Sequence, residues 1–146
     1  MMAILGPGQK PIVMPHYPHM MAEDTAVWTK FLQMEVVEIK RVWYDVRVGM
    51  SVLRMVEPST RESRIAAGLT RKRIDVIATV GEDFWVIEVK PRANMYAVGQ
   101  VLVYTRLFGQ EYVTTGQVIS VIVCGNSDED LQDEFEDFGI LVFETD

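Results

Sequence analysis

The chain has 146 residues, of which 49% are hydrophobic, and it carries a formal net charge of -7. This length fits one compact domain that buries about two-thirds of the surface of its unfolded chain. The apolar runs are broken by charged residues well before the roughly 18 residues that a membrane span needs, and no charged-then-apolar signal pattern opens the chain. We therefore expect an intracellular protein without a membrane partner, in the cytoplasm or, if it is viral, in the host cytoplasm.

Charge is unevenly distributed along the chain. Residues 41–106 hold eleven Arg or Lys against seven acids, whereas residues 107–146 hold ten acids and no Arg or Lys. A basic centre can present a phosphate-binding face even in an acidic protein, although a solvated surface without any partner produces the same asymmetry. The single cysteine, Cys124, cannot form an internal disulfide, and its apolar setting indicates the end of a buried strand.

The first half of the chain begins with residues 1–20, whose four prolines predict an extended arm that precedes a single domain over 21–146. Apolar residues at helical spacing, with acids in the first turn, predict a helix over 22–33. Strict alternation then predicts a strand with one face formed by Val42, Tyr44, Val46 and Val48. A long basic loop is expected over 49–72.

The second half begins with two β-rich segments, 74–80 and 84–89, which Gly81-Glu82 joins in a tight hairpin. Pro91 is expected to end the second of these strands. A helix over 93–108, closed by Gly109, follows. The remaining segments predict a buried strand over 118–123, an acidic helix over 128–138 and a short strand over 140–143. The order αβββαβαβ indicates an α/β (α+β) domain with a central mixed sheet flanked by helices.

The turn sequence Gly81-Glu82 fixes the register of this hairpin. Glycine at the first position of a two-residue loop suits a type II′ turn, because that position needs a positive φ. The register then places Asp75 opposite Glu88. Under this register, Lys90 lies on the same face as Glu88, and Arg73 lies across from Lys90. Two carboxylates at that distance repel each other unless something compensates.

Two interpretations of this cluster remain open. Alternating charges in strands commonly form an ion network without a chemical role. Alternatively, the acids interrupt apolar strands, where a carboxylate is costly unless bound, and Mg²⁺ takes one or two carboxylates together with waters and phosphate oxygens. Lys90 would add a compact cation beside the same oxygens. Gln100 and Tyr104 share one side of the following helix, either as solvated and core-edge residues or as further members of the site.

The order Asp75, Glu88-Val89-Lys90, Gln100 and Tyr104 resembles the PD-(D/E)XK nuclease superfamily, in particular its RecB-like and Holliday-junction-resolvase-like branch. The resemblance covers about residues 42–109. It implies a restriction-endonuclease-like αβββαβ core, here with an extra C-terminal αβ unit. It also implies that Asp75, Glu88 and the backbone carbonyl of Val89 ligate Mg²⁺ or Mn²⁺, and that Lys90 orients or activates the attacking water.

The chain departs from the family pattern at two places. Ile74 stands where the family motif has a proline. Many members also carry a glutamate on the first helix, and here both Glu23 and Glu35 compete for that role. We expect Glu23, which lies near the helix start, although an acid that only stabilises the helix N-terminus explains it as well.

The resemblance implies a metal-dependent DNA endonuclease that is structure-specific or weakly sequence-specific, with DNA as its partner. Because the chain is short, we also expect a second copy of the chain as a partner for specificity. The alternative is a nuclease-fold subunit that binds or assembles without cleaving, which the acidic C-terminal segment favours. His16 and His19 lack a third metal ligand and belong to the arm. Candidate contacts to the DNA backbone, which solvated charges would also explain, are Arg61, Arg64, Arg71, Lys72, Arg73 and Arg92.

Overall fold

The computed structural model describes residues 2–50, 61 and 71–146. The predicted order of elements is confirmed over these residues, whereas most of the expected basic loop, with Arg64, lies outside them. The elements in chain order are α1 (Ala22–Met34), β1 (Arg41–Val48), β2 (Lys72–Val80), β3 (Asp83–Ala93), α3 (Met95–Glu111), β4 (Val118–Ser127), the 3-10 turn η1 (Glu129–Leu131), α4 (Gln132–Asp137) and β5 (Leu141–Glu144).

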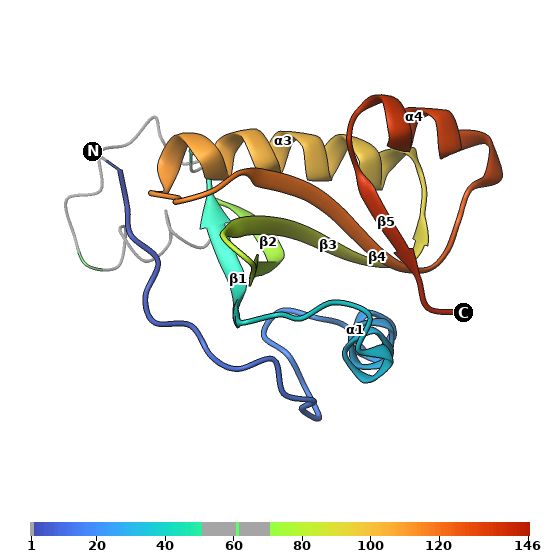
Figure 1. Ribbon diagram of the computed structural model, residues 1–146, viewed down its shortest axis with the longest axis horizontal. Coiled ribbons are helices and arrows are strands. Elements are labelled where there is room, and N and C mark those ends of the chain that lie inside the picture. The colour runs from blue at the N-terminus through green and yellow to red at the C-terminus, as the bar shows by residue number, and fades with distance from the viewer. Residues whose placement is uncertain (1, 51–60, 62–70) are drawn as a thin grey trace.

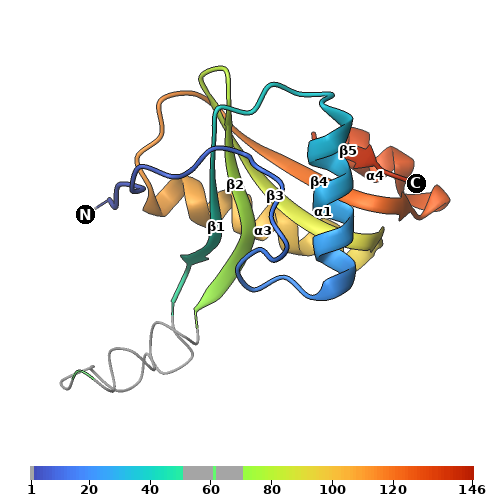
Figure 2. The ribbon, with the colours of Figure 1, turned by 90° about the horizontal axis from the view of Figure 1, so that it is seen from below.

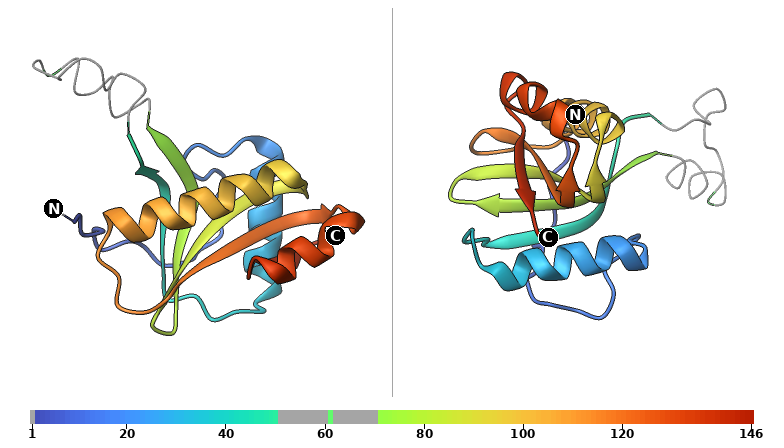
Figure 3. Two further views of the ribbon diagram at one scale, coloured as in Figure 1. Left: turned by 90° about the horizontal axis from the view of Figure 1, so that it is seen from above. Right: turned by 90° about the vertical axis from the view of Figure 1, so that its right-hand side faces the viewer.

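The five strands form one mixed sheet in the order β1-β2-β3-β4-β5 (Figure 1). The first three strands pair antiparallel, and β3, β4 and β5 pair parallel. Helix α1 covers one face of the sheet, and α3 and α4 cover the other (Figure 3). The protein is therefore an α+β domain with a mixed sheet between two helical layers. In the described part of the chain, no helix has the length and apolar character that crossing a membrane requires.

Each helical layer buries its own core against the sheet. On one face, α1 buries Trp28 and Phe31 against β-branched and aromatic residues of β2, β3 and β4. On the other face, α3 buries Val101 and Phe108. Side chains on both faces of β3 are buried over residues 85–89, so the charge of Glu88 in this stretch is costly unless it has a partner.

The N-terminal arm crosses the same face of the sheet as α1 (Figure 2). Gln9 exchanges two backbone hydrogen bonds with Val42 at the edge of the sheet. The side chain of Tyr17 is buried, and its hydroxyl lies 2.8 Å from Oγ1 of Thr29 in α1. These contacts fix the arm at both ends of its path, and Tyr17 closes the core beneath α1.

Two predicted element boundaries were wrong. Pro91 does not end β3, because its ladder with β4 omits only that residue and resumes at Arg92 opposite Asn126. Proline lacks a backbone N–H donor, so Pro91 loses its own ladder pairing with β4, but the strand continues beyond it. Helix α3 begins at Met95, since the Asn94 side chain caps it by accepting from two backbone N–H groups, and it runs past Gly109 to Glu111.

The prediction that β1 presents four residues on one face was also wrong. Val42 packs in the core beneath α1, whereas Val46 and Val48 pack in the core beneath α3. The change of face occurs at Asp45, whose φ of 56° is not that of a strand. Strand β2 changes face at the equivalent point, since Ile74 belongs to the α3 core and Val76 to the α1 core.

Candidate metal centre

The hairpin of β2 and β3 has the predicted register. Val80 pairs with Asp83 across the turn, Gly81 has the required positive φ, and the ladder continues to Val76 opposite Ile87. It ends there, one pair before Asp75 and Glu88. Asp75 instead uses Oδ2 to accept a hydrogen bond from the backbone N–H of Val89 at 2.9 Å. The Asp75 carboxylate thus accepts the hydrogen bond that a backbone carbonyl of the neighbouring strand would otherwise accept.

The carboxyl groups of half-buried Asp75 and buried Glu88 act on each other. Glu88 is only 2% exposed, and its Oε1 has no hydrogen-bond partner among the described residues. Burial, followed by the negative charge of Asp75, raises the pKa of Glu88 well above its ordinary value. Burial likewise raises the pKa of Asp75, although the Val89 N–H and the charge of Lys90 oppose it. A pair of this kind holds a proton until a cation replaces it.

Lys90 is the cation nearest to this pair. Its Nζ lies 3.9 Å from Oε2 of Glu88, and its side chain is 31% exposed. At that distance the ammonium lowers the pKa of both carboxyl groups without a tight contact to either. Lys90 therefore lies near one oxygen of Glu88, and Oε1 has no hydrogen-bond partner among the described residues.

Helix α3 brings Gln100 and Tyr104 to the same cluster. Burial, followed by the charges of Glu88 and Asp75, raises the pKa of the Tyr104 hydroxyl, and a hydrogen bond with Gln100 opposes the rise. Oε1 of Gln100 is buried and, among the described residues, has no hydrogen-bond partner. Glu88 and Gln100 thus each have a buried acceptor oxygen without a donor among the described residues, and oxygen atoms of this kind suit a hard cation or its bound water.

Among the acids of α1, Asp24 is the one whose charge acts on Asp75. Burial raises the pKa of Asp24, and the charge of Lys90 is the largest influence that lowers it. Glu23 is exposed, and Glu35 ends the helix in the left-handed conformation and lines a separate pocket. The sequence contained the signal, because Asp24 continues the buried stripe of Val27, Trp28 and Phe31 at helical spacing, whereas Glu23 is set off from it.

Replacing Asp24 with asparagine should weaken Mn²⁺ binding by about 10-fold, because outer carboxylates that shape a metal site typically contribute that much. Calorimetric titration of Mn²⁺ into the Asp24→Asn and Glu23→Gln variants compares the two first-turn acids directly. We expect the first substitution to have the larger effect. Equal losses, or a larger loss in Glu23→Gln, would contradict the assignment of Asp24.

The structure divides the candidate DNA contacts by their partners. Arg73 forms a forked ion pair with Asp45, Arg71 pairs with Glu111, and Arg92 pairs with Asp128 and also donates to Asn126. Lys72 and Arg61 are exposed. The expectation that Arg73 lies beside Lys90 was wrong, because the change of face at Asp75 sends the Arg73 side chain to Asp45 instead.

Comparison with family models, with curated proteins and with solved structures found no match to this chain. The site is therefore described by its own geometry. In residues 2–50, 61 and 71–146, no group of three or more His, Cys, Asp or Glu side chains is placed to hold a metal ion together. The Asp75 and Glu88 pair fits Mg²⁺ or Mn²⁺ nonetheless, because such ions commonly take one or two protein carboxylates and complete their shell with water and substrate oxygens.

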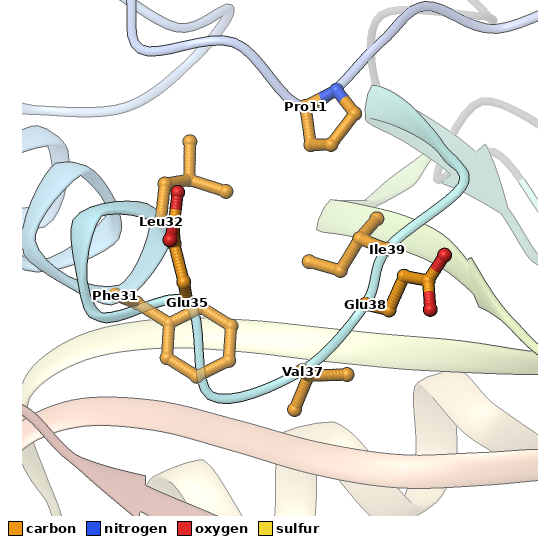
Figure 4. Close-up of a pocket in the computed structure, with 7 residues that line it drawn as sticks. All are labelled: Pro11, Phe31, Leu32, Glu35, Val37, Glu38 and Ile39. Carbon is orange, nitrogen blue, oxygen red and sulfur yellow. The ribbon is translucent and has the colours of Figure 1, made fainter.

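A separate pocket of about 370 Å³ lies between the arm and the end of α1 (Figure 4). Its apolar wall includes Phe31, Leu32 and Ile39, and Glu35 and Glu38 lie at its rim. None of the carboxylate-site residues lines it. This pocket therefore belongs to the packing of the arm against α1 and not to the candidate metal centre.

Proposed function

We propose that this chain is a Mg²⁺- or Mn²⁺-dependent DNA nuclease with a restriction-endonuclease-like PD-(D/E)XK core. The observation that supports it best is the pair of half-buried Asp75 and buried Glu88, in which Glu88 Oε1 lacks a donor and Lys90 Nζ lies 3.9 Å from Oε2. Burial disfavours the charged forms of two neighbouring carboxyl groups, so the metal-free pair retains a proton, and a cation can take its place.

The roles of the residues follow from their places. Asp75, Glu88 and the carbonyl of Val89 hold the cation, and Asp24 adds negative charge from α1. When bound, the cation supplies a water of lowered pKa and neutralises charge on the phosphate. Lys90 orients that water and offsets negative charge that develops on the phosphate during the reaction. Tyr104, whose hydroxyl is influenced by the charges of Glu88 and Asp75, and Gln100 would form the α3 side of the site.

DNA is the proposed substrate, cut within the strand and with weak sequence preference. The exposed cation of Lys72 lies in the same strand as Asp75, and Lys90 is at the site itself. Phosphate contacts of this kind position a duplex without reading its bases. A second copy of the chain would supply the additional surface that a domain of this size needs to hold a duplex.

Incubating the protein with supercoiled plasmid and with single-stranded DNA, in Mg²⁺, Mn²⁺ or EDTA, tests the proposal. We expect cleavage with either ion and none in EDTA. Replacing Lys90 with alanine should reduce the rate by about 100- to 1000-fold, because it removes a cation preplaced for the transition state. The exposed Lys40 provides the matched control, and Lys40→Ala should cleave at the wild-type rate.

Absence of cleavage by the wild-type protein, or equal rates for Lys90→Ala and wild type, would refute the nuclease proposal. If wild type binds Mn²⁺ but cleaves neither substrate, the chain is instead a nuclease-fold subunit without this activity. Metal binding and cleavage are therefore measured on the same samples.

A further inference from the structure

Asp75 is the residue of β2 whose backbone is held least by the sheet. Its ladder with β1 pairs Ile74 with Val46 and Val76 with Tyr44 but omits Asp75. Its ladder with β3 ends at Val76. Among the described residues, Asp75 thus has no partner in either ladder. Its position must be set by other contacts, because ladder hydrogen bonds normally fix a strand residue.

Asp45 is the residue of β1 that lies opposite this gap, and its backbone conformation is unusual for a strand. Its φ of 56° is left-handed, a conformation that non-glycine residues adopt at a cost of about 1–3 kcal/mol. Both strands change face at this point, as the core positions of Val46 and Ile74 show. Asp45 and Asp75 together form a paired break in the alternation of the two strands.

An ion pair holds this break. Nε and Nη2 of Arg73 each donate to one carboxylate oxygen of Asp45, both at 2.6 Å. Arg47 approaches the same carboxylate at 3.9 Å. Burial of Asp45 acts to raise its pKa, but the hydrogen bonds and charge of Arg73 outweigh burial and lower it. Arg73 is two residues from Asp75 on the same strand, so this fork fixes the backbone immediately before the candidate ligand.

We propose that Asp45 and Arg73 form a clamp that positions Asp75 for metal binding, with Asp45 as a positioning residue of the site. The clamp maintains the change of face, and the change of face frees the Asp75 backbone from the ladders. The Asp75 carboxylate can then accept from Val89 N–H and lie beside Glu88. The consequence for metal binding rests on the proposed function, whereas the consequence for the Val89 hydrogen bond does not.

Amide hydrogen exchange in the Asp45→Asn variant tests the clamp directly. Asparagine tolerates the left-handed conformation, so the substitution removes the ionic fork without imposing new backbone strain. We expect exchange of the Val89 amide to become at least about 10-fold faster, while the ladder amide of Val86 exchanges as in wild type. Affinity for Mn²⁺ should fall by about 10-fold, as it does when an outer-shell partner of a metal ligand is lost.

Two further variants make the result specific. Arg73→Lys keeps the positive charge but loses the fork, and should also speed Val89 exchange and weaken Mn²⁺ binding. Lys30→Gln removes the exposed ion pair between Lys30 and Asp146, and should change neither quantity. If Asp45→Asn does not fold, Arg73→Lys decides the question by the same two measurements.

Unchanged Val89 exchange in Asp45→Asn and Arg73→Lys would overturn the clamp, as would an equal acceleration at Val86, since the pair would then serve stability alone. If wild type binds no Mn²⁺, the proposed function fails, and Val89 exchange still decides whether the clamp positions Asp75. If wild type binds Mn²⁺ and both variants bind it equally well, the proposed function stands and the positioning role is lost.

Discussion

Replacing Glu88 with glutamine should abolish Mn²⁺ binding and reduce DNA cleavage by at least about 100-fold, while making the metal-free protein more stable by about 1–2 kcal/mol. Function and stability move in opposite directions because Glu88 is buried beside Asp75 and its pKa is raised by burial and by that neighbour. A neutral amide costs less to bury than a carboxylate, and its NH₂ group can donate to Asp75. Calorimetric titration, cleavage rates and urea unfolding in EDTA measure the three effects.

The opposed signs separate a metal site from an ion network. If Glu88 served only to pair with Lys90, its replacement would remove a favourable contact and lower stability. A loss of stability in Glu88→Gln, with Mn²⁺ binding retained, would therefore contradict the proposed site. Glu82, exposed in the turn of the same hairpin, is the matched control, and Glu82→Gln should leave all three quantities unchanged.

The hairpin register could be predicted from sequence because one glycine specifies it. Gly81 takes the positive φ that the turn requires, and every ladder pair from Val80 and Asp83 to Val76 and Ile87 follows from that turn. Local chemistry is sufficient when a two-residue loop leaves no other register open. The meeting of Asp75 and Glu88 followed from this register, although it is the side chains that meet and not a ladder pair.

The break opposite Asp75 could not be predicted, because alternation in the sequence remains regular through it. Val42, Tyr44, Val46 and Val48 read as one face of a strand, yet Asp45 divides them between two cores. An Asp within a strand does not by itself indicate a left-handed conformation, so the sequence pattern does not predict the break. The partner of Arg73 depends on this break, and the sequence therefore predicted Lys90 as its neighbour and not Asp45.

The free energy of unfolding of the metal-free protein should decrease as pH rises above the ordinary pKa of Glu88, 4.5. Folding raises the pKa of Glu88 and that of Asp75, so the folded protein binds protons more tightly than the unfolded chain. Their contribution is fully present below the ordinary values and is lost as pH rises through the raised values. The slope approaches about 1.4 kcal/mol per pH unit for each group that titrates in this way.

Asp45 contributes with the opposite sign, because Arg73 lowers its pKa and its contribution is lost only on acidification below its ordinary value of 3.8. The decrease above pH 4.5 therefore belongs to the carboxyl groups whose pKa is raised, which are the Asp75 and Glu88 pair together with Asp24. Urea unfolding over a pH series in EDTA should show it in wild type and show it much reduced in Glu88→Gln.

Saturating Mn²⁺ should reverse the slope, since the ion binds the deprotonated carboxylates and its affinity rises with pH. A metal-free stability that is flat or increasing with pH in wild type would contradict raised pKa values in the Asp75 and Glu88 pair. If Mn²⁺ leaves the dependence of the unfolding free energy on pH unchanged, the cation does not bind at the carboxyl groups that hold the protons. The raised pKa values would then stand, and the proposed metal site would not.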